Sequence, residues 1–146
     1  MLVGGATAAD RAALDALVRR ALAEAAARGR AGLRGRMLSA SPDELLAGRL
    51  GADPPTLLVA RAPGPVGFAI LEFNELAVEL AAIFVDPPAR RCGVGRALLA
   101  AAERIAAARA SALEVYVAAG NRAEKALLES AGYRAAVLLM QRRGVG

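Results

Sequence analysis

The chain has 146 residues, of which 56% are hydrophobic and only 3% aromatic, and its 19 basic and 14 acidic side chains give a formal net charge of +5. This length predicts one domain spanning residues 1–146, with a core of leucine, valine, isoleucine and alanine. One cysteine and no histidine exclude an intramolecular disulfide and predict no metal site.

The distribution of charged and apolar residues narrows the possible partners. The arginines form no sustained basic tract and few aromatic residues accompany them, so the sequence predicts no nucleic-acid partner. Glu79 interrupts the most hydrophobic region, which predicts no membrane span. The first five residues lack the basic and apolar regions of a signal peptide, and we therefore expect a cytoplasmic location.

The first half of the chain predicts a short strand followed by two helices. Leu2 and Val3 form the strand, and a helical pattern begins at Thr7, with an apolar stripe made of Leu14, Leu17, Val18, Ala21, Leu22 and Ala25. Glycines at positions 29, 32 and 35 end this helix and predict a mobile loop. Ser41 caps the second helix, Glu44 completes its capping box, and the helix is expected to end near Gly51.

The second half predicts five further strands and two further helices. Residues 56–61, 66–73 and 76–85 are apolar runs separated by turn residues, which predicts an antiparallel meander. A helix over 95–109, a strand over 113–117, a helix capped by Asn121 and ending at Gly132, and a last strand over 133–141 follow. The order β-α-α-β-β-β-α-β-α-β predicts an α+β domain with a mixed, mostly antiparallel central sheet flanked by about four helices.

The segment after the strand over 76–85 has the features of a phosphate-binding loop. Pro87 and Pro88 end the strand, because proline cannot donate a ladder hydrogen bond. Glycines at 93 and 95 let the backbone approach an oxyanion closely, and the start of the next helix adds its free amides and positive dipole. Arginines at 90, 91 and 96 add positive charge. The loop therefore predicts a site for the pyrophosphate of a coenzyme.

This loop resembles the signature of the GNAT superfamily of acyl-CoA-dependent N-acetyltransferases. Arg90-x-x-Gly93-x-Gly95 fits the family motif Arg/Gln-x-x-Gly-x-Gly/Ala, and the flanking Val-Asp-Pro and Arg-Ala-Leu-Leu are similar too. The glycine patterns of a nucleotide P-loop and of a dinucleotide-binding fold do not fit. The predicted element order is also that of the family, so the resemblance implies a GNAT-like fold over the whole chain.

The resemblance implies that acetyl-CoA is the acyl donor, and it assigns residues to it. The backbone at Phe84 and Val85 is expected to hold the pantetheine arm. Amides along the loop are expected to hold the pyrophosphate, with Asn121 as a further contact or a plain helix cap. The loop residues are Arg90, Arg91, Cys92, Gly93, Val94, Gly95 and Arg96.

Glu79 is the candidate general base. Acyl transfer to an amine requires that the ammonium lose its proton, and a carboxylate within reach can accept it. Glu79 lies eleven residues before Arg90, which is the offset of the catalytic glutamate in many members of the family it resembles. Strand alternation predicts that it shares a face with Ala81, Ile83 and Val85. The alternative is a solvent-facing or ion-paired glutamate at the sheet edge.

The acid that protonates the departing thiolate is absent from its usual place. The family often has a tyrosine seven residues after the asparagine, and here that position is Leu128, which cannot donate a proton. Tyr116 and Tyr133 are the nearest alternative donors, and water is another. Cys92 has no histidine to activate it, so we interpret it as a loop residue rather than a nucleophile.

Two functions fit these features. The first is transfer of an acetyl group from acetyl-CoA to a primary amine by direct attack in a ternary complex. The second is a non-catalytic CoA-binding sensor or interaction domain, which Leu128 favours and Glu79 opposes. The sequence does not identify the amine acceptor, and the resemblance alone suggests a homodimer formed through exposed strand edges.

Overall fold

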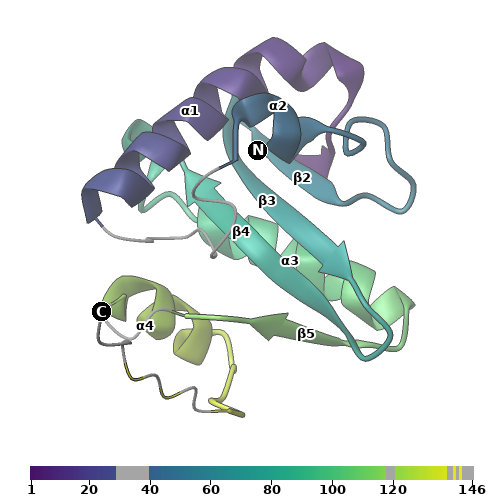
Figure 1. The fold of residues 1–146 in the computed structure, drawn as a ribbon, viewed down its shortest axis with the longest axis vertical. Coiled ribbons are helices and arrows are strands. Elements are labelled where there is room, and N and C mark those ends of the chain that lie inside the picture. Colours follow the sequence, from purple (N-terminus) through teal and green to yellow (C-terminus); the bar gives the residue numbers. More distant parts are fainter. Residues whose placement is uncertain (29–39, 118–120, 138–139, 141, 143–146) are drawn as a thin grey trace.

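The computed structural model describes residues 1–28, 40–117, 121–137, 140 and 142. Its centre is a five-stranded sheet in the order β1-β2-β3-β4-β5, as Figure 1 shows. The first four strands form an antiparallel meander, and β5 pairs with β4 in parallel. The strands are β1 (Leu2–Gly5), β2 (Leu57–Arg61), β3 (Pro65–Phe73), β4 (Ala77–Val85) and β5 (Ala112–Val115). The predicted meander is confirmed.

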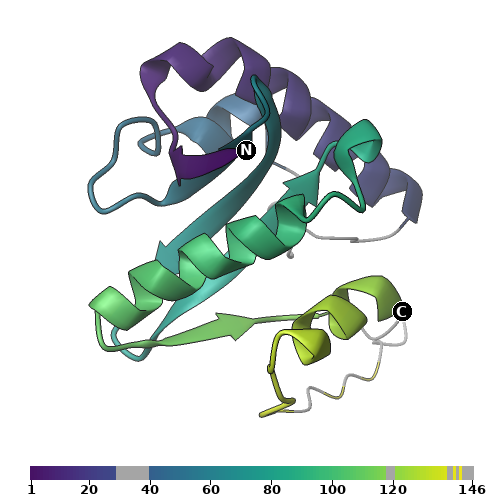
Figure 2. The same ribbon diagram turned by 180° about the vertical axis from the view of Figure 1, so that it is seen from behind.

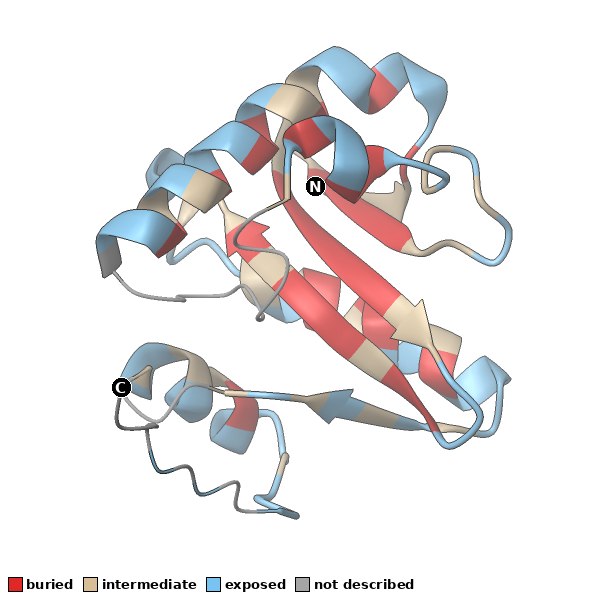
Figure 3. Cartoon of the chain, viewed as in Figure 1, coloured by how far each residue is buried: buried red, intermediate tan, exposed pale blue. Residues whose placement is uncertain are grey.

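Helices cover the two faces of this sheet. α1 (Arg11–Arg28) and α2 (Pro42–Leu46) lie on one face, α3 (Val94–Ala108) lies on the other, and α4 (Arg122–Ser130) follows β5 (Figures 1 and 2). The predicted stripe of α1 is buried, apart from the half-buried Leu22. On the opposite face, α3 buries Leu98, Ala102 and Ala106. β2, β3 and β4 therefore lie between two apolar layers, which Figure 3 shows as the buried centre of the molecule.

The helix ends follow the predicted capping residues with two differences in detail. The Ser41 hydroxyl accepts the amide of Glu44 at 3.2 Å, but α2 already ends at Leu46 rather than near Gly51. A short 3-10 helix, Ala8–Asp10, precedes α1, and Asp10 accepts the Thr7 amide at 2.8 Å. Of the helices in the described part of the chain, none has the length and apolar character that a transmembrane span requires.

The last predicted strand is not formed where the structure describes it. Residues 133–137 have no strand pairing, and positions 138, 139 and 141 lie outside the described residues, as does the predicted loop at 29–35. The side chain of Val137 in this predicted strand is 87% exposed. A strand depends on ladder hydrogen bonds and on burial, and residues 133–137 have neither a partner strand nor a buried face.

One extra residue in β4 changes which side chains face each layer. The register pairs Ile70 with Ala82 but Leu71 with Leu80, so Ala81 is the additional residue of a β-bulge. Ala81 and Ala82 consequently both join the α1 layer, whereas Ile83 packs in the α3 layer. Strict alternation fails at this point of β4.

Close packing of α3 against β3 and β4 depends on a residue without a side chain at position 67. A Cβ atom at Gly67 would lie 2.9 Å from the carbonyl oxygen of Phe84, 3.1 Å from Val94 Cγ1 and 3.4 Å from Leu98 Cδ1. We expect Gly67→Ala to lower the free energy of unfolding by about 1–3 kcal/mol through overpacking.

Denaturant unfolding of Gly67→Ala measures this effect, and Gly64→Ala is the matched control. The control adds the same methyl group in the neighbouring turn, where the new atom would meet nothing within 4 Å. Equal losses in the two variants would show that steric crowding at Gly67 is not the cause.

Candidate functional site

The edge of β4 that faces β5 is paired over only half its length. β5 pairs with β4 from Ala77 to Leu80, and no described strand pairs with that edge from the bulge onward. Beyond Val85, the amide of Asp86 donates to the Val66 carbonyl of β3 at 2.8 Å. Backbone groups alternate along a strand, so the amides of Val85 and Ile83 point to the open edge. This edge can accept an extended ligand by strand-like hydrogen bonding.

The same alternation directs the backbone of Phe84 toward β3, where it faces Phe68. Of the two strand residues predicted to hold the pantetheine arm, Val85 thus presents its backbone to the open edge and Phe84 does not. Ile83 takes that place, and sequence reasoning missed it because the register that sets the alternation comes from the pairing with β3. The Phe84 ring lies in the α1 layer.

The loop from β4 to α3 is shaped by two left-handed residues. After the short 3-10 helix Pro87–Ala89, the φ angles are +63° at Arg91 and +79° at Gly93. Such a φ is uncommon for an arginine and costs free energy, so surrounding contacts must hold it. α3 begins at Val94, and the Ala97 amide donates to the Gly93 carbonyl at 3.0 Å. The amides before Ala97 in α3 have no partner within the helix. Free amides at a helix N-terminus are suited to bind an anion.

The three arginines of the loop have different surroundings. Arg90 points away from the loop amides: its Nε donates to the Val85 carbonyl at 2.9 Å and its Nη2 to Glu24 at 2.6 Å. Arg96 donates to the Ser130 hydroxyl of α4 at 2.9 Å, and Arg91 is exposed. The prediction that all three surround a phosphate therefore needs correction, because the guanidinium of Arg90 is directed to α1.

Gly95 faces the space between the end of β4 and α4. A Cβ atom there would lie 3.6 Å from Leu127 Cδ2 and 3.8 Å from Val85 Cγ2, which are ordinary contact distances. A methyl group therefore fits, while a larger side chain would enter the space beside the open edge. Val94 is buried in the α3 layer, so it contributes to the loop only through its backbone.

Glu79 lies on the α1 side of the sheet, opposite Glu72 of β3 and Glu114 of β5 in the register. It shares this face with Ala81, but the bulge puts Ile83 and Val85 on the other face, which corrects the predicted set. Its side chain is half-buried. Three carboxylates thus follow one another across three strands on one face of the sheet.

Arg49 holds the first of these carboxylates in the sheet. Its Nη1 donates to the Leu71 carbonyl at 3.1 Å, and its Nη2 lies 3.7 Å from Glu72 Oε1. The Arg49 side chain is 19% exposed, so this contact is screened less than one on the surface. Glu72 is thereby placed beside a positive charge.

The two candidate tyrosines lie on different faces. Val115 and Val117 pack in the α3 layer, so alternation puts Tyr116, which is 54% exposed, on the face of Glu79. The Tyr133 hydroxyl donates to Glu103 of α3 at 2.9 Å, and Tyr133 packs against the α3 layer. Burial, with the Glu103 contact, raises the pKa of Tyr133. Tyr133 is therefore separated from Glu79 by the sheet.

The remaining predicted residues have structural contacts of their own. Asn121 caps α4: its Oδ1 accepts the Glu124 amide at 3.2 Å and its Nδ2 donates to the Glu124 carboxylate at 2.7 Å. Burial raises the pKa of Glu124. Leu128 is buried in the α3 layer, and Cys92 is exposed, with its Sγ 3.5 Å from the Arg90 carbonyl. Among the described residues, no group of His, Cys, Asp and Glu could hold a metal ion.

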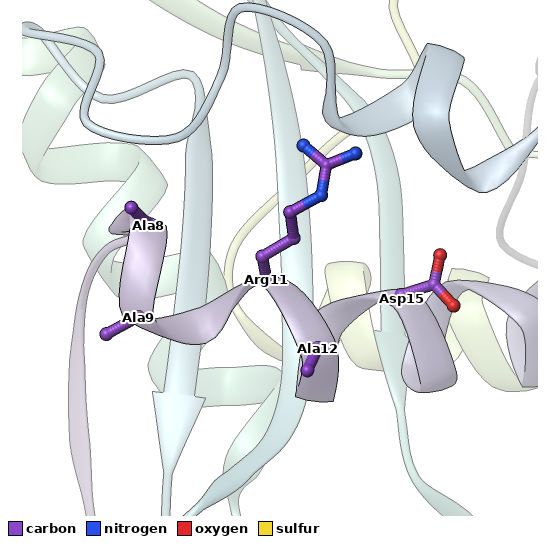
Figure 4. Close-up of a pocket in the computed structure, with 5 residues that line it drawn as sticks. All are labelled: Ala8, Ala9, Arg11, Ala12 and Asp15. Atoms are coloured by element: carbon purple, nitrogen blue, oxygen red, sulfur yellow. The ribbon is translucent and has the colours of Figure 1, made fainter.

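A hollow of about 540 Å³ at the start of α1 lies apart from this arrangement. Figure 4 shows its lining, which is Ala8, Ala9, Arg11, Ala12 and Asp15. The hollow is open to solvent, and Arg11 is already bound to Asp43 at 2.9 Å. Thirteen helical residues separate Arg11 from Glu24, which is about 20 Å along α1. We therefore base the candidate site on the β4–α3 loop and not on this hollow.

Known proteins are similar to the part of the chain that contains the β4–α3 loop. A family model described as the acetyltransferase (GNAT) family matches residues 35–133. A mycothiol acetyltransferase of Clavibacter sepedonicus is 40% identical over 97 residues, which are 64% of this chain and 31% of that protein. The chain thus spans about a third of the length of that relative.

Solved structures share the fold. A ribosomal-protein-alanine N-acetyltransferase from Brucella melitensis is 30% identical, with a TM-score of 0.70 over 90% of this chain and 83% of that one. AAC(6')-Iy, solved with the bisubstrate analogue CoA-S-monomethyl-acetylneamine, is 21% identical, with a TM-score of 0.66 over 98% of each chain. These likenesses confirm the predicted fold class.

The left-handed turn at Gly93 yields a stability prediction. A Cβ atom at Gly93 would meet nothing within 4 Å, so the cost of Gly93→Ala comes from the φ of +79° alone, about 1–2 kcal/mol. Gly95→Ala adds the same methyl group inside α3 at ordinary contact distance and is expected to stabilise the helix by up to about 1 kcal/mol. Thermal unfolding of both variants checks the opposite signs, and a loss of stability in Gly95→Ala would contradict the loop geometry.

Proposed function

Because the chain belongs to the acetyltransferase (GNAT) family, we propose that it transfers an acetyl group from acetyl-CoA to a primary amine by direct attack in a ternary complex. The observation that carries this proposal is the continuity of two binding elements. The open edge of β4 after the bulge runs directly into the left-handed loop and the free amides at the start of α3. CoA has an extended pantetheine arm that ends in a pyrophosphate. The arm matches the edge of β4, and the pyrophosphate matches the amides that follow it.

On the donor side, we assign the loop amides from Arg91 to Arg96 to the pyrophosphate. The exposed side chains of Arg91 and Arg96 supply positive charge there. The amides of Ile83 and Val85 hold the pantetheine arm as a strand would, while the Val85 carbonyl accepts from Arg90. Gly95 keeps the space beside Val85 free of a side chain, which the arm requires.

On the acceptor side, we assign the role of general base to Glu79. The cationic amine first loses one proton to Glu79. The neutral nitrogen then forms a bond to the thioester carbonyl carbon, the carbon–sulfur bond breaks, and the nitrogen releases its second proton to solvent. Glu72 and Glu114 share its face, so the field there favours a cationic amine over an anionic acceptor. Of the three carboxylates, Glu79 belongs to β4 itself and lies two residues from the bulge at Ala81.

The departing thiolate must take up one proton. We assign this step to Tyr116 or to water, because Tyr116 lies on the face of Glu79 and is accessible. Tyr133 is engaged by Glu103 on the opposite face, and Leu128 is buried in the α3 layer, so neither supports that role. A CoA thiol is acidic enough that a missing side-chain acid slows the reaction rather than preventing it.

The acyl group is proposed to be acetyl because two relatives, 40% and 30% identical to the chain, are described as acetyltransferases. The non-catalytic alternative, a CoA-binding sensor, is supported by Leu128 at the usual tyrosine position. Thiol release from acetyl-CoA with a panel of primary amines separates the two. Amine-dependent release supports the enzyme, whereas CoA binding by calorimetry without release from any amine supports the sensor.

Glu79 provides the sharpest test of the mechanism. In Glu79→Gln we expect turnover to fall roughly 10²-fold at neutral pH, because the amine loses its proton acceptor. The KM for acetyl-CoA is expected to stay unchanged, since Glu79 acts on the acceptor. The deficit is expected to shrink as pH rises, because more of the amine is then unprotonated. A pH–rate profile of both proteins measures this.

Glu72→Gln is the matched control for this measurement. It makes the same exchange of carboxylate for amide at the directly opposite position of β3. We expect a small loss of turnover with no recovery at high pH. If the two variants lose turnover equally at every pH, Glu79 contributes charge to the face and is not the base.

A further inference from the structure

Two ion pairs join α1 to the loop between β4 and α3. Arg20 donates to Asp86 through Nε at 3.0 Å and Nη2 at 3.2 Å. Glu24 accepts from Arg90 Nη2 at 2.6 Å. Arg20 and Glu24 lie one helical turn apart on α1, and Asp86 and Arg90 bracket the 3-10 helix Pro87–Ala89. We call these four residues the charged clamp.

The signs of the charged clamp select one docking position for α1. The helix presents a positive and then a negative charge, and the loop presents a negative and then a positive one. A slide of α1 by one turn, about 5.4 Å, would bring Glu24 to Asp86 or Arg20 to Arg90. Like charges would then face each other, which is unfavourable. The clamp therefore fixes where the loop lies relative to α1.

Arg90 connects this clamp to the end of β4. Its Nε bonds the Val85 carbonyl at 2.9 Å, and its guanidinium carbon lies 5.5 Å from the centre of the Phe84 ring. The side chains of Arg90 and Glu24 are 34% and 21% exposed, so their attraction is only partly screened. One guanidinium thus contacts α1, the last strand carbonyl and an aromatic ring of the α1 layer.

From these contacts we propose that Glu24 is a positioning residue for the coenzyme, acting through Arg90. Arg90 supports the loop from the α1 side and is not itself a phosphate ligand. The amides of residues 91–96 are then held in place by the clamp before the coenzyme arrives. The inference rests on the proposed binding of CoA at this loop.

The clamp and simple electrostatics predict opposite effects for Glu24→Gln. Removal of a negative charge near an anion site, with release of Arg90 toward the phosphate, would tighten CoA binding. Loss of the clamp loosens the loop, and we expect the Kd for CoA to rise about fivefold, the size that a partly buried ion pair supports. Asp15→Asn is the matched control, because it removes a negative charge from the same helix and breaks only the Arg19 contact at 2.8 Å.

The experiment is a calorimetric titration of CoA into the full chain at fixed ionic strength. Wild type is measured first: if it does not bind CoA, the proposed function fails. If it binds, a Kd that rises in Glu24→Gln and stays within twofold of wild type in Asp15→Asn supports the clamp. A Kd that is unchanged or lower in Glu24→Gln overturns the inference while the proposed function stands.

A double-mutant cycle identifies Arg90 as the group through which Glu24 acts. In an Arg90→Gln background, Glu24→Gln is expected to leave the Kd unchanged, because the guanidinium through which Glu24 acts on the loop is already absent. A full additional effect of Glu24→Gln there would refute the route through Arg90. In steady state, Glu24→Gln is expected to raise the KM for acetyl-CoA and leave the KM for the amine unaltered, a split that general destabilisation does not produce.

Asp86→Asn gives a second, independent arm should Glu24→Gln fail to fold. It also removes a negative charge beside the loop, and it breaks the pair with Arg20. The clamp again predicts a higher Kd for CoA, and electrostatics alone predicts a lower one. A lower Kd in this folded variant overturns the inference.

Discussion

The additional residue at Ala81 is the constraint on which the site depends. Without it, strict alternation would carry Glu79 and Phe84 to opposite faces of β4. With it, both face the α1 side, while Leu80 before the bulge and Ile83 after it pack in the α3 layer. The pairing with β5 stops at the residue before the bulge, so the same irregularity that redirects side chains also leaves a backbone edge open. Bulges commonly end pairing and redirect side chains in this way.

Apolar burial and ion pairs determine different aspects of the position of α1. Burial of Leu14, Leu17 and Val18 contributes roughly 1.5–3 kcal/mol for each side chain, whereas a partly exposed ion pair contributes about 1 kcal/mol or less. The apolar stripe therefore decides that α1 lies on the sheet. Hydrophobic contact is non-directional, so it discriminates weakly between neighbouring positions along the helix axis. The charged clamp supplies that discrimination at the end of α1 nearest the loop.

The strands of the meander, the helix starts and the position of the loop could be predicted from the sequence. Apolar runs separated by turn residues identified the meander, and caps at Ser41 and Asn121 located two helix starts. The bulge at Ala81 was invisible, because a run of alanine and apolar residues satisfies alternation in either register. The partner of Arg90 was equally out of reach, since Glu24 lies 66 residues earlier and only the packed fold brings them together. The strand expected after Gly132 failed for a related reason, because a pattern cannot show whether a partner edge exists.

The two halves of the site meet at the bulge. Along an extended strand, Val85 and Ala81 are about 13 Å apart, so the open edge has a definite length between the loop and the end of β5 pairing. In the proposed complex, the pantetheine arm is anchored at the loop and extends along that edge. Its far end then reaches the bulge, and Glu79 lies two residues beyond it. In that proposal, donor binding uses backbone groups in the plane of the sheet, whereas Glu79 and its neighbouring carboxylates project from one face. The bulge thus lets one strand serve both reactants without their competing for the same groups.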